Sequence, residues 1–510
     1  MAAFVLSQMT GLLRQVLVSR AFGTGLEIDA FNAAARLPDL LFSLIAGGAL
    51  ASAFIPTFTG FLAKQDRQGA WQLASSIANL ASLLLALTSL LAAIFASQIV
   101  RYLLYGLVPD LDPARLALTV SLLRIMLLSP VIFGISGLLM GILNAHQVFL
   151  LPALAPTMLW LGMIFGVLAL APVWGIHGLA WGYVLGAALH LGVQLPALRL
   201  LRGKYFANLG LHIPAVRQVG RLMAPRLLGV AVVQINFLVN TILASAQREG
   251  SLTAIQIAWA VMTMPQVVIA QAIAIAALPT FSAQVARGEL GEMRASLAAT
   301  LRGVILLSMP AAMGLILLRR PVIVLLFQGG EFDAYSTDLV AWALLWYTAG
   351  LVGHSVVEIV ARAFYALHDT FTPVLVGVAA MSLNIGFSLA FSALFARIGW
   401  MPHGGLALAN SLATALEMVG LLVLMRRKLK GLEGANILAG TVQVALATLL
   451  MSLALWAWLA FCSSRPAWLV AGGGVAIGVG VYGLVIWISG VREARGLARV
   501  LAHRIRRGLA

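Results

Sequence analysis

The stretch AFNAAARLPDLLFSLIAGGALASAFIPTF, residues 30–58, has a later counterpart in AIQIAWAVMTMPQVVIAQAIAIAALPTF, residues 254–281. Both are apolar, both contain an internal proline, Pro38 and Pro265, and both end on Pro-Thr-Phe. The offsets between the matched prolines and between the matched endings are 227 and 223 residues. Because roughly 20 apolar helical residues cross the hydrocarbon core of a bilayer, each stretch is long enough to span a membrane. The pair therefore predicts a membrane protein with an internal repeat.

A second pair of segments repeats at a similar offset. LNAHQVFLLP, which ends at Pro152, resembles FYALHDTFTP, which ends at Pro373. In this comparison His146 is matched with His368. Two echoes with proline in register predict two pseudo-symmetric six-helix lobes built as parallel repeats. In transporters of this plan the substrate path lies between the repeats.

The composition indicates that lipid is the main solvent of the chain. Of the 510 residues, 61% are hydrophobic and 10% are charged, whereas an ordinary globular domain is about 25% charged. The net charge of +16 comes from basic residues that stand singly or in short groups between apolar spans, which does not indicate nucleic-acid binding. The single cysteine, Cys462, excludes an internal disulfide framework. The N-terminus lacks the features of a signal peptide and is interpreted as the first span.

The apolar pattern predicts an all-α polytopic membrane protein with about fourteen transmembrane helices. The predicted spans are residues 2–22, 29–62, 71–105, 114–145, 150–171, 177–199, 220–246, 252–284, 293–318, 335–366, 372–396, 403–426, 436–462 and 467–490. The expected parts are an N-lobe (1–200), a link (201–219), a C-lobe (220–430), two further spans (431–490) and a basic tail (491–510).

The basic residues gather in alternate connections. One set of connections and the tail together carry 19 Lys and Arg residues, and the other set carries 5. Because cytoplasmic loops carry the excess of Lys and Arg, both termini and the link 201–219 are predicted to face the cytoplasm. The expected location is the bacterial cytoplasmic (inner) membrane.

Ionisable side chains inside the spans are candidate site residues, because a charge in hydrocarbon is costly unless it faces a cavity or a partner. Arg14 lies midway along the first span, and Asp29 and Arg36 stand seven residues apart on one face of the second. A helix terminus stabilised by the helix dipole is the alternative for Asp29. A cationic cavity in the first lobe suits an anionic substrate, since arginine binds phosphate through its planar fork of donors.

Further polar residues lie in the fourth, seventh and tenth spans. They are Arg124, Asn144, Arg226, Gln234, Asn236, Asn240, His354, Glu358 and Arg362. The amides are candidates for substrate binding or for interhelical hydrogen bonds. His354, Glu358 and Arg362 share one helical face, either as a linked acid and base set or as a buried salt bridge. No Walker A, HExxH or GxSxG motif occurs, so neither an enzyme nor a bound cofactor or metal is expected.

Five stretches carry a resemblance to a known family. They are LLRQVLVSRAFGTGLEIDAFNAAARLPDLL, ALASAFIPTF, GILNAHQVFLLPALAPT, APRLLGVAVVQINFLVNTILAS and FYALHDTFTPV, spread over most of residues 4–430. In this order they resemble the MurJ (MviN) lipid II flippases of the multidrug/oligosaccharidyl-lipid/polysaccharide exporter superfamily. The resemblance implies two six-helix lobes in a V around a cationic cavity, and a lipid-facing groove beside the last two helices.

The resemblance also implies roles for single residues. Arg14 matches the family's cavity arginine of the first span, Asp29 its acidic residue at the start of the second, and Arg36 the basic residue before the Leu-Pro. The chain departs from the family's charged pattern at four positions, Gln8, Gln15, Phe42 and Ala260. Three of these, Gln8, Phe42 and Ala260, replace arginines expected to hold pyrophosphate, and Arg124, Arg226 or Arg362 are candidates to compensate.

The sequence thus predicts a flippase that moves the lipid-linked peptidoglycan precursor, lipid II, by alternating access. Its expected partners are an anionic undecaprenyl-pyrophosphate substrate, membrane lipids and, by resemblance, a coupling ion or the membrane potential. Two alternatives stay open: an exporter of another polyprenyl-linked glycan or small amphiphile, and a non-transporting membrane scaffold of cell-wall synthesis.

Overall fold

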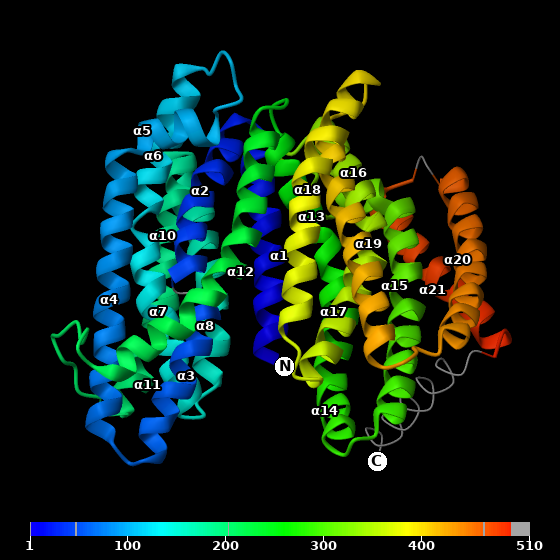
Figure 1. Cartoon of the computed structure of the whole chain (residues 1–510). Helices are drawn as coiled ribbons and strands as arrows, with labels where there is room; N and C mark the ends of the chain where they lie inside the picture. The colour runs from blue at the N-terminus through cyan, green and yellow to red at the C-terminus, as the bar shows by residue number, and fades with distance from the viewer. Residues whose placement is uncertain (1, 46–47, 202, 463–464, 491–510) are drawn as a thin grey trace, which may run out of the picture. The chain divides into compact units, whose positions relative to one another are not determined.

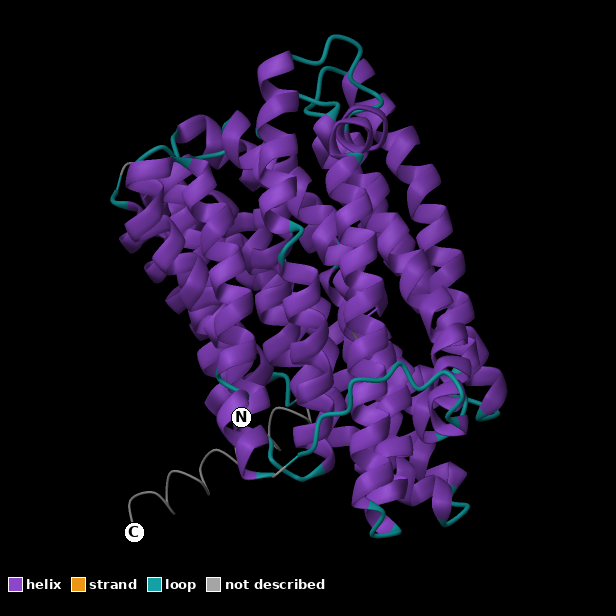
Figure 2. Cartoon of the chain, turned by 90° about the vertical axis from the view of Figure 1, so that its left-hand side faces the viewer, coloured by secondary structure: helices purple, strands orange, loops and turns teal. Residues whose placement is uncertain are grey.

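A computed structural model describes residues 2–45, 48–201, 203–462 and 465–490 (Figure 1). Across these ranges the chain folds into helices and loops, and the one β-type pairing is an isolated bridge between Gly329 and Phe332. The predicted all-α class is confirmed. The predicted basic tail, 491–510, lies outside the described residues. Figure 2 shows helices along nearly the whole drawn chain, with loops mainly near their ends.

The helices follow one another in the order of the predicted spans. They are α1 (Ala2–Phe22), α2 (Leu26–Ile45), α3 (Gly48–Ala63), α4 (Arg67–Ile94), α5 (Ala96–Gln98), α6 (Pro113–Met126), α7 (Ser129–Ala145), α8 (Leu150–Phe165), α9 (Ala171–Trp174), α10 (Ile176–Gly192), α11 (Leu195–Leu200), α12 (Pro214–Ser245), α13 (Ser251–Gln266), α14 (Ala272–Ala286), α15 (Leu290–Phe327), α16 (Ala334–Ala349), α17 (Leu351–Ala366), α18 (Phe371–Arg397), α19 (His403–Lys428), α20 (Gly434–Cys462) and α21 (Ala467–Ile488). Three short π-helical segments also occur, η1 (Ile99–Leu104), η2 (Gly166–Leu170) and η3 (Val267–Gln271).

Each predicted span corresponds to one helix or to a run of consecutive helices. Of the helices that the structure describes, ten are long and apolar enough to cross a membrane alone, or up to twelve if each bent pair counts as one span. The other two predicted spans are α1 and the pair α2 and α3. Several long spans are interrupted, as between α6 and α7, where Pro130 begins the second helix because proline cannot donate a helical hydrogen bond.

The helices group into two compact units. The first holds residues 1–253 and a short segment, 329–333, whose Glu331 N–H donates to the carbonyl of Arg20 at 2.9 Å. The second holds residues 254–328 and the described residues from Ala334 onward. The expected lobe boundary at 200–219 differs from this grouping, because α12 packs against α2 and α3 of the first unit.

In the first unit, α8 and α10 approach each other through small residues. Gly162 and Gly166 of α8 and η2 face Gly186 and Gly182 of α10. A Cβ atom added to Gly162 would lie 2.3 Å from the Cα atom of Gly186, closer than any side chain allows. Such contacts are typical of membrane helices, where van der Waals packing replaces the hydrophobic effect. They place Trp160 of α8 and Tyr183 of α10 on neighbouring helices.

The predicted repeat is visible in the turns of the two units. Gln147 and His368 both adopt left-handed backbone, with φ of 62° and 58°, just before α8 and α18 begin. Their offset of 221 residues equals that of Pro152 and Pro373. The turn register therefore pairs Gln147 with His368, one residue away from the pairing of His146 that the sequence suggests.

The stretches 30–58 and 254–281 also end in turns of matching geometry. Phe58 and Phe281, which end the two Pro-Thr-Phe motifs, are both buried in hydrophobic clusters of their units. Seven residues later, Gln65 and Gly288 each adopt positive φ, 58° and 74°, in the turn that ends the span. The local geometry thus repeats at the ends of both pairs of stretches, at offsets of 221 and 223 residues. Pro38 and Pro265, which are 227 residues apart, lie about one helical turn outside this register.

The second unit encloses a larger apolar core between α14, α15, α17 and α19, with α20 and α21 packed on α15. Phe281, Leu301 and Phe364 are each at most 1% exposed in this core. The hydroxyl of Tyr482 on α21 donates to the carbonyl of Leu306 on α15 at 2.6 Å. This hydrogen bond fixes the last helix to the longest one.

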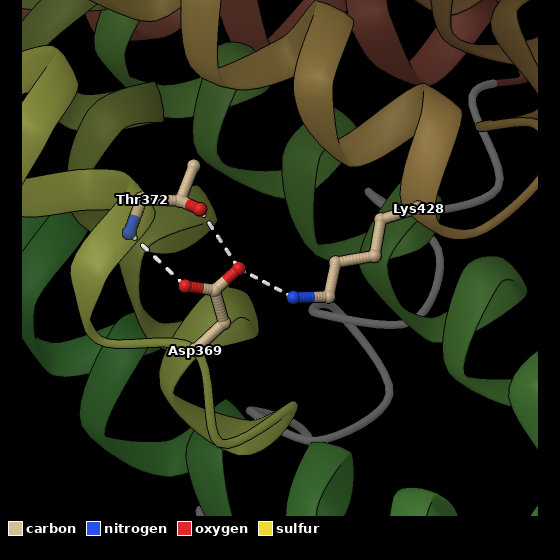
Figure 3. A network of polar contacts seen from close by, with 3 residues as sticks. All are labelled: Asp369, Thr372 and Lys428. Carbon is tan, nitrogen blue, oxygen red and sulfur yellow. Dashed lines mark hydrogen bonds and ion pairs between the residues drawn. The ribbon is translucent and has the colours of Figure 1, made fainter.

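A polar network joins the ends of α17, α18 and α19 in the second unit (Figure 3). Asp369 accepts hydrogen bonds from the N–H of Thr372 at 3.0 Å and from its hydroxyl at 2.8 Å, which caps the start of α18. Its carboxylate also forms an ion pair with Lys428 at the end of α19. The hydrogen bond from Lys428, followed by the one from the Thr372 N–H, lowers the pKa of Asp369 to about 2.

We predict that Asp369→Asn lowers the stability of the protein near neutral pH by about 1 kcal/mol, because a charge-assisted hydrogen bond is lost. A carboxylate with a lowered pKa stabilises the fold above its unfolded pKa of 3.8, and this contribution is lost as the pH falls towards about 2. The stability difference between the two proteins should therefore shrink below about pH 4. Thermal unfolding in detergent at several pH values measures it. The matched control, Asp110→Asn, changes an exposed carboxylate and should show little difference at any pH; equal effects of the two variants would contradict the prediction.

Candidate functional site

Arg14 of α1 lies against α8 in the first unit. Its guanidinium carbon lies 4.8 Å from the ring centroid of Trp160, a cation–π distance. The contact is possible because Gly11 lets α1 approach the indole closely, since a Cβ atom there would lie 3.2 Å from its Nε1. The Nε atom of Arg14 is buried and has no hydrogen-bond partner in the part of the chain that the structure describes. This donor is therefore unsatisfied among the described residues, as are the Nε atoms of Arg115 and Arg294.

Arg36 of α2 connects α2 with α12. Its Nη2 atom donates to the side-chain oxygen of Gln234 at 2.6 Å, and its guanidinium carbon lies 5.0 Å from the ring centroid of Phe237. The Nε atom of Arg36 is also buried without a partner among the described residues. The structure thus brings together two predicted site residues, Arg36 and Gln234, which the sequence separates by 198 positions.

Asp39 belongs to the same site and was missed by the sequence analysis. Its Oδ1 atom accepts a hydrogen bond from the hydroxyl of Tyr183 at 2.7 Å, and the charges of Arg36 and Arg14 both act on its carboxylate. The signal was an acidic residue one helical turn after Arg36, inside a predicted span. We call Arg14, Arg36, Asp39, Tyr183 and Gln234 the polar cluster. Two arginines against one aspartate give it a net charge of +1.

Asp29, at the start of α2, makes a different set of contacts. Its side chain is 1% exposed and accepts hydrogen bonds from the N–H groups of Gly250 and Thr253 at 2.8 and 2.9 Å, and from the Thr253 hydroxyl at 2.6 Å. These donors belong to the start of α13, whose first N–H groups have no helical acceptors. Asn32 donates to the same hydroxyl at 2.9 Å. Asp29 therefore caps a helix 221 residues away, and its described hydrogen bonds include none to an arginine.

The remaining predicted site residues lie elsewhere. Arg124 is exposed on α6 and donates to the carbonyl of Ala93 at 3.1 Å, and Asn144 is half-buried near the end of α7. Asn240 donates to Asn236 one turn earlier on α12 at 3.3 Å.

Glu358 and Arg362 form a half-buried ion pair of 2.6 Å on α17 in the second unit, which is the salt-bridge alternative. His354, one turn before this pair, contacts Asn410 at 3.1 Å. The side chain of Arg226 lies outside the described residues.

Phe42, at one expected arginine position, packs inside the first unit. Its ring centroid lies 5.1 Å from that of Phe133 on α7, and Phe133 lies 5.9 Å from Tyr183. Phe133 thus packs against Tyr183 of α10, the residue that donates a hydrogen bond to Asp39. The missing arginine is replaced by packing next to the polar cluster.

Long apolar helices with repeated turns and a buried cationic cluster define a polytopic membrane transporter. Solved structures share the fold: one titled "Lipid II flippase MurJ, inward closed conformation" has a TM-score of 0.82 at 24% identity, covering 96% of this chain and 97% of that one. An inward-facing multidrug resistance MATE family transporter of the MOP superfamily has a TM-score of 0.68 at 15% identity, covering 85% and 95%.

Sequence comparisons identify the family. The model of the family "Lipid II flippase MurJ" matches residues 18–471. The Lipid II flippase MurJ of Burkholderia cenocepacia is 32% identical over 430 residues, 83% of this chain and 82% of its own length. The Probable lipid II flippase MurJ of Vibrio cholerae is 28% identical over 513 residues, 96% and 95% of the two chains. The chain belongs to the MurJ family, which confirms the resemblance found in the sequence.

We predict that Asp29→Ala destabilises the protein by about 3 kcal/mol, because it leaves three buried donors without an acceptor. Asp29→Asn should cost less, since its amide oxygen still accepts the bonds from Thr253. Thermal unfolding measures both variants against Glu27→Ala, which removes an exposed carboxylate from the same turn. A loss for Asp29→Ala no larger than that for Glu27→Ala would show that the cap is not stabilising.

Proposed function

We propose that this chain translocates lipid II, the lipid-linked peptidoglycan precursor, across the cytoplasmic membrane by alternating access. Membership of the MurJ family supports this function. The observation that carries the proposal for the site is the polar cluster, in which Arg14 and Arg36 each keep a buried Nε donor without a partner. An anion such as pyrophosphate supplies the acceptors that these donors lack.

The cluster has the parts needed to bind an anion reversibly. Arg14 and Arg36 supply the positive charge, and the planar fork of each guanidinium suits phosphate oxygens. Asp39, held by Tyr183, reduces the net charge and competes with the anion for the arginines. In this proposal the competition weakens binding enough for release, while the polyprenyl tail stays in lipid. No covalent step is involved, and the energy comes from an ion gradient or the membrane potential.

Asp29 serves as a gate residue in this proposal. Its bonds to Gly250 and Thr253 hold the start of α13, and α13 continues into the second unit. Breaking and remaking this cap during the transport cycle would control access from the outer side.

An exporter of another polyprenyl-linked glycan is the second candidate. The packing of Phe42 against Phe133, in place of an expected arginine contact, favours it. Both candidates use the same pyrophosphate site and differ in the glycan.

We propose that both termini and the link 201–219 face the cytoplasm, from the excess of 19 over 5 basic residues. The prediction uses two exposed positions, His212 in the link and Arg248 between α12 and α13. In a Cys462→Ser background, His212→Cys should react with a membrane-impermeant thiol reagent only after the cell is opened. Arg248→Cys should react in intact cells. The reverse pattern would invert the topology.

We predict that Arg14→Ala lowers lipid II translocation by about tenfold or more. A hydrogen bond to a charged group contributes about 1.5 kcal/mol or more, and about 1.4 kcal/mol corresponds to a factor of ten. Arg14→Lys should retain part of the activity through charge alone. Translocation is measured in proteoliposomes with lipid II and with a polyprenyl-linked glycan lacking the pentapeptide. Arg124→Ala is the matched control, because it removes an exposed arginine outside the cluster.

Normal transport by Arg14→Ala, or its disappearance from the membrane, would assign Arg14 a packing role. Transport of the second glycan in preference to lipid II would favour the second candidate. Transport of neither by the wild type would favour a scaffold.

A further inference from the structure

A pocket of about 570 Å³ opens at one end of the second unit, between the start of α18 and the end of α19. Its apolar wall includes Phe371 and Leu375 of α18 and Leu424 of α19, and its polar rim includes Arg427 and Lys428. It lies in a different unit from the polar cluster and shares no residue with it.

The rim of the pocket is cationic. Lys428 is paired with Asp369 in the network of Figure 3. Arg427 is exposed, and the described part of the chain gives it no hydrogen bond or ion pair. Arg426 and Lys430 are exposed on the same chain segment but do not line the pocket. Two basic residues against one acidic residue give the rim a net charge of +1, which suits a monovalent anion.

The wall of the pocket continues along a membrane-spanning helix. Phe371 is 71% exposed and Leu375 is 56% exposed, one turn apart on α18. Exposed aromatic and aliphatic side chains at the end of a membrane-spanning helix are better solvated by lipid acyl chains than by water. A free phosphate would leave this wall uncovered, whereas a lipid covers both the rim and the wall.

The described residues of the first unit show no equivalent of the Asp369–Lys428 ion pair. The turn register that pairs Gln147 with His368 puts Val148 at the position of Asp369. Valine cannot form an ion pair with lysine. Among the described turns of the two repeats, the ion pair that positions Lys428 therefore occurs in the second unit alone. The repeated turn therefore forms without this ion pair in the first unit.

We propose that this pocket binds an acidic glycerophospholipid, with the headgroup phosphate on Arg427 and Lys428 and an acyl chain along Phe371 and Leu375. Asp369 positions Lys428 and is not itself a ligand. In the proposed topology the pocket faces the cytoplasmic leaflet, whose acidic lipids attract basic residues by about 1 kcal/mol each. Lipid binding at this site is separate from substrate translocation and is measured without it.

The test is a lipid titration of the purified full chain in detergent, followed by native mass spectrometry. The probes are dioleoyl phosphatidylglycerol and dioleoyl phosphatidylcholine, which share acyl chains and differ in charge. The wild type should bind the first more tightly. Arg427→Gln should lower its affinity about fivefold or more, while Arg426→Gln, which changes the same charge outside the pocket, should leave it within about twofold.

A second pair of variants tests the apolar wall. Leu375→Ser should weaken phosphatidylglycerol binding, and Leu383→Ser, which changes an exposed leucine deeper on α18, should not. This pair decides the outcome if Arg427→Gln does not fold.

Three results would overturn the proposal. They are equal losses in Arg426→Gln and Arg427→Gln, equal losses in the two leucine variants, or equal affinity for the two lipids. Displacement of the lipid by inorganic phosphate, with the same dependence on Arg427, would identify free phosphate as the occupant and also overturn it.

Discussion

The energetic cost of a charge in hydrocarbon is the constraint on which this structure depends. The first two spans carry Arg14, Asp29, Arg36 and Asp39, any of which would oppose insertion if it faced lipid. Each has its own partner in the first unit: an indole for Arg14, an amide for Arg36, a phenol for Asp39 and a helix start for Asp29. The packing of α2, α8, α10 and α12 around these groups follows from the need to satisfy them.

The spans and the repeat could be predicted from the sequence because both depend on local composition. A run of about twenty apolar residues indicates a membrane span whatever the tertiary fold. The matched motifs that end at Pro152 and Pro373 likewise identify matched turns. What the sequence could not show was contact between distant segments. Asp29 and Thr253 are 224 residues apart, and no local pattern links them. The division after residue 253 has the same cause, since the packing of α12 on α2 and α3 is a tertiary choice.

Charges predicted deep in a span and charges near a helix break have different surroundings in the structure. Arg14 and Arg36 have buried Nε atoms beside aromatic rings, as the cost of an exposed charge requires. Arg124 appeared equally deep in a predicted span of residues 114–145, but that span is two helices, and Arg124 lies close to their junction. Its Nε atom donates to the carbonyl of Ala93 near the end of α4, so this bond requires no ligand. Asp39 could not be assigned from the sequence because its partner, Tyr183, lies 144 residues away.

The two units have the same turn geometry but differ in how their charged side chains are paired. In the first unit the arginines outnumber the carboxylate of the polar cluster, and two Nε donors stay without acceptors. In the second, the ion pair of Glu358 and Arg362 within α17 has no net charge. A repeated fold requires the same backbone geometry in both halves, but it does not require the same charges. Arg294 of the second unit also has a buried Nε atom without a partner among the described residues, so an unpaired donor alone does not indicate a ligand. What distinguishes the polar cluster is that two such donors stand beside a net positive charge, which a bound anion would balance.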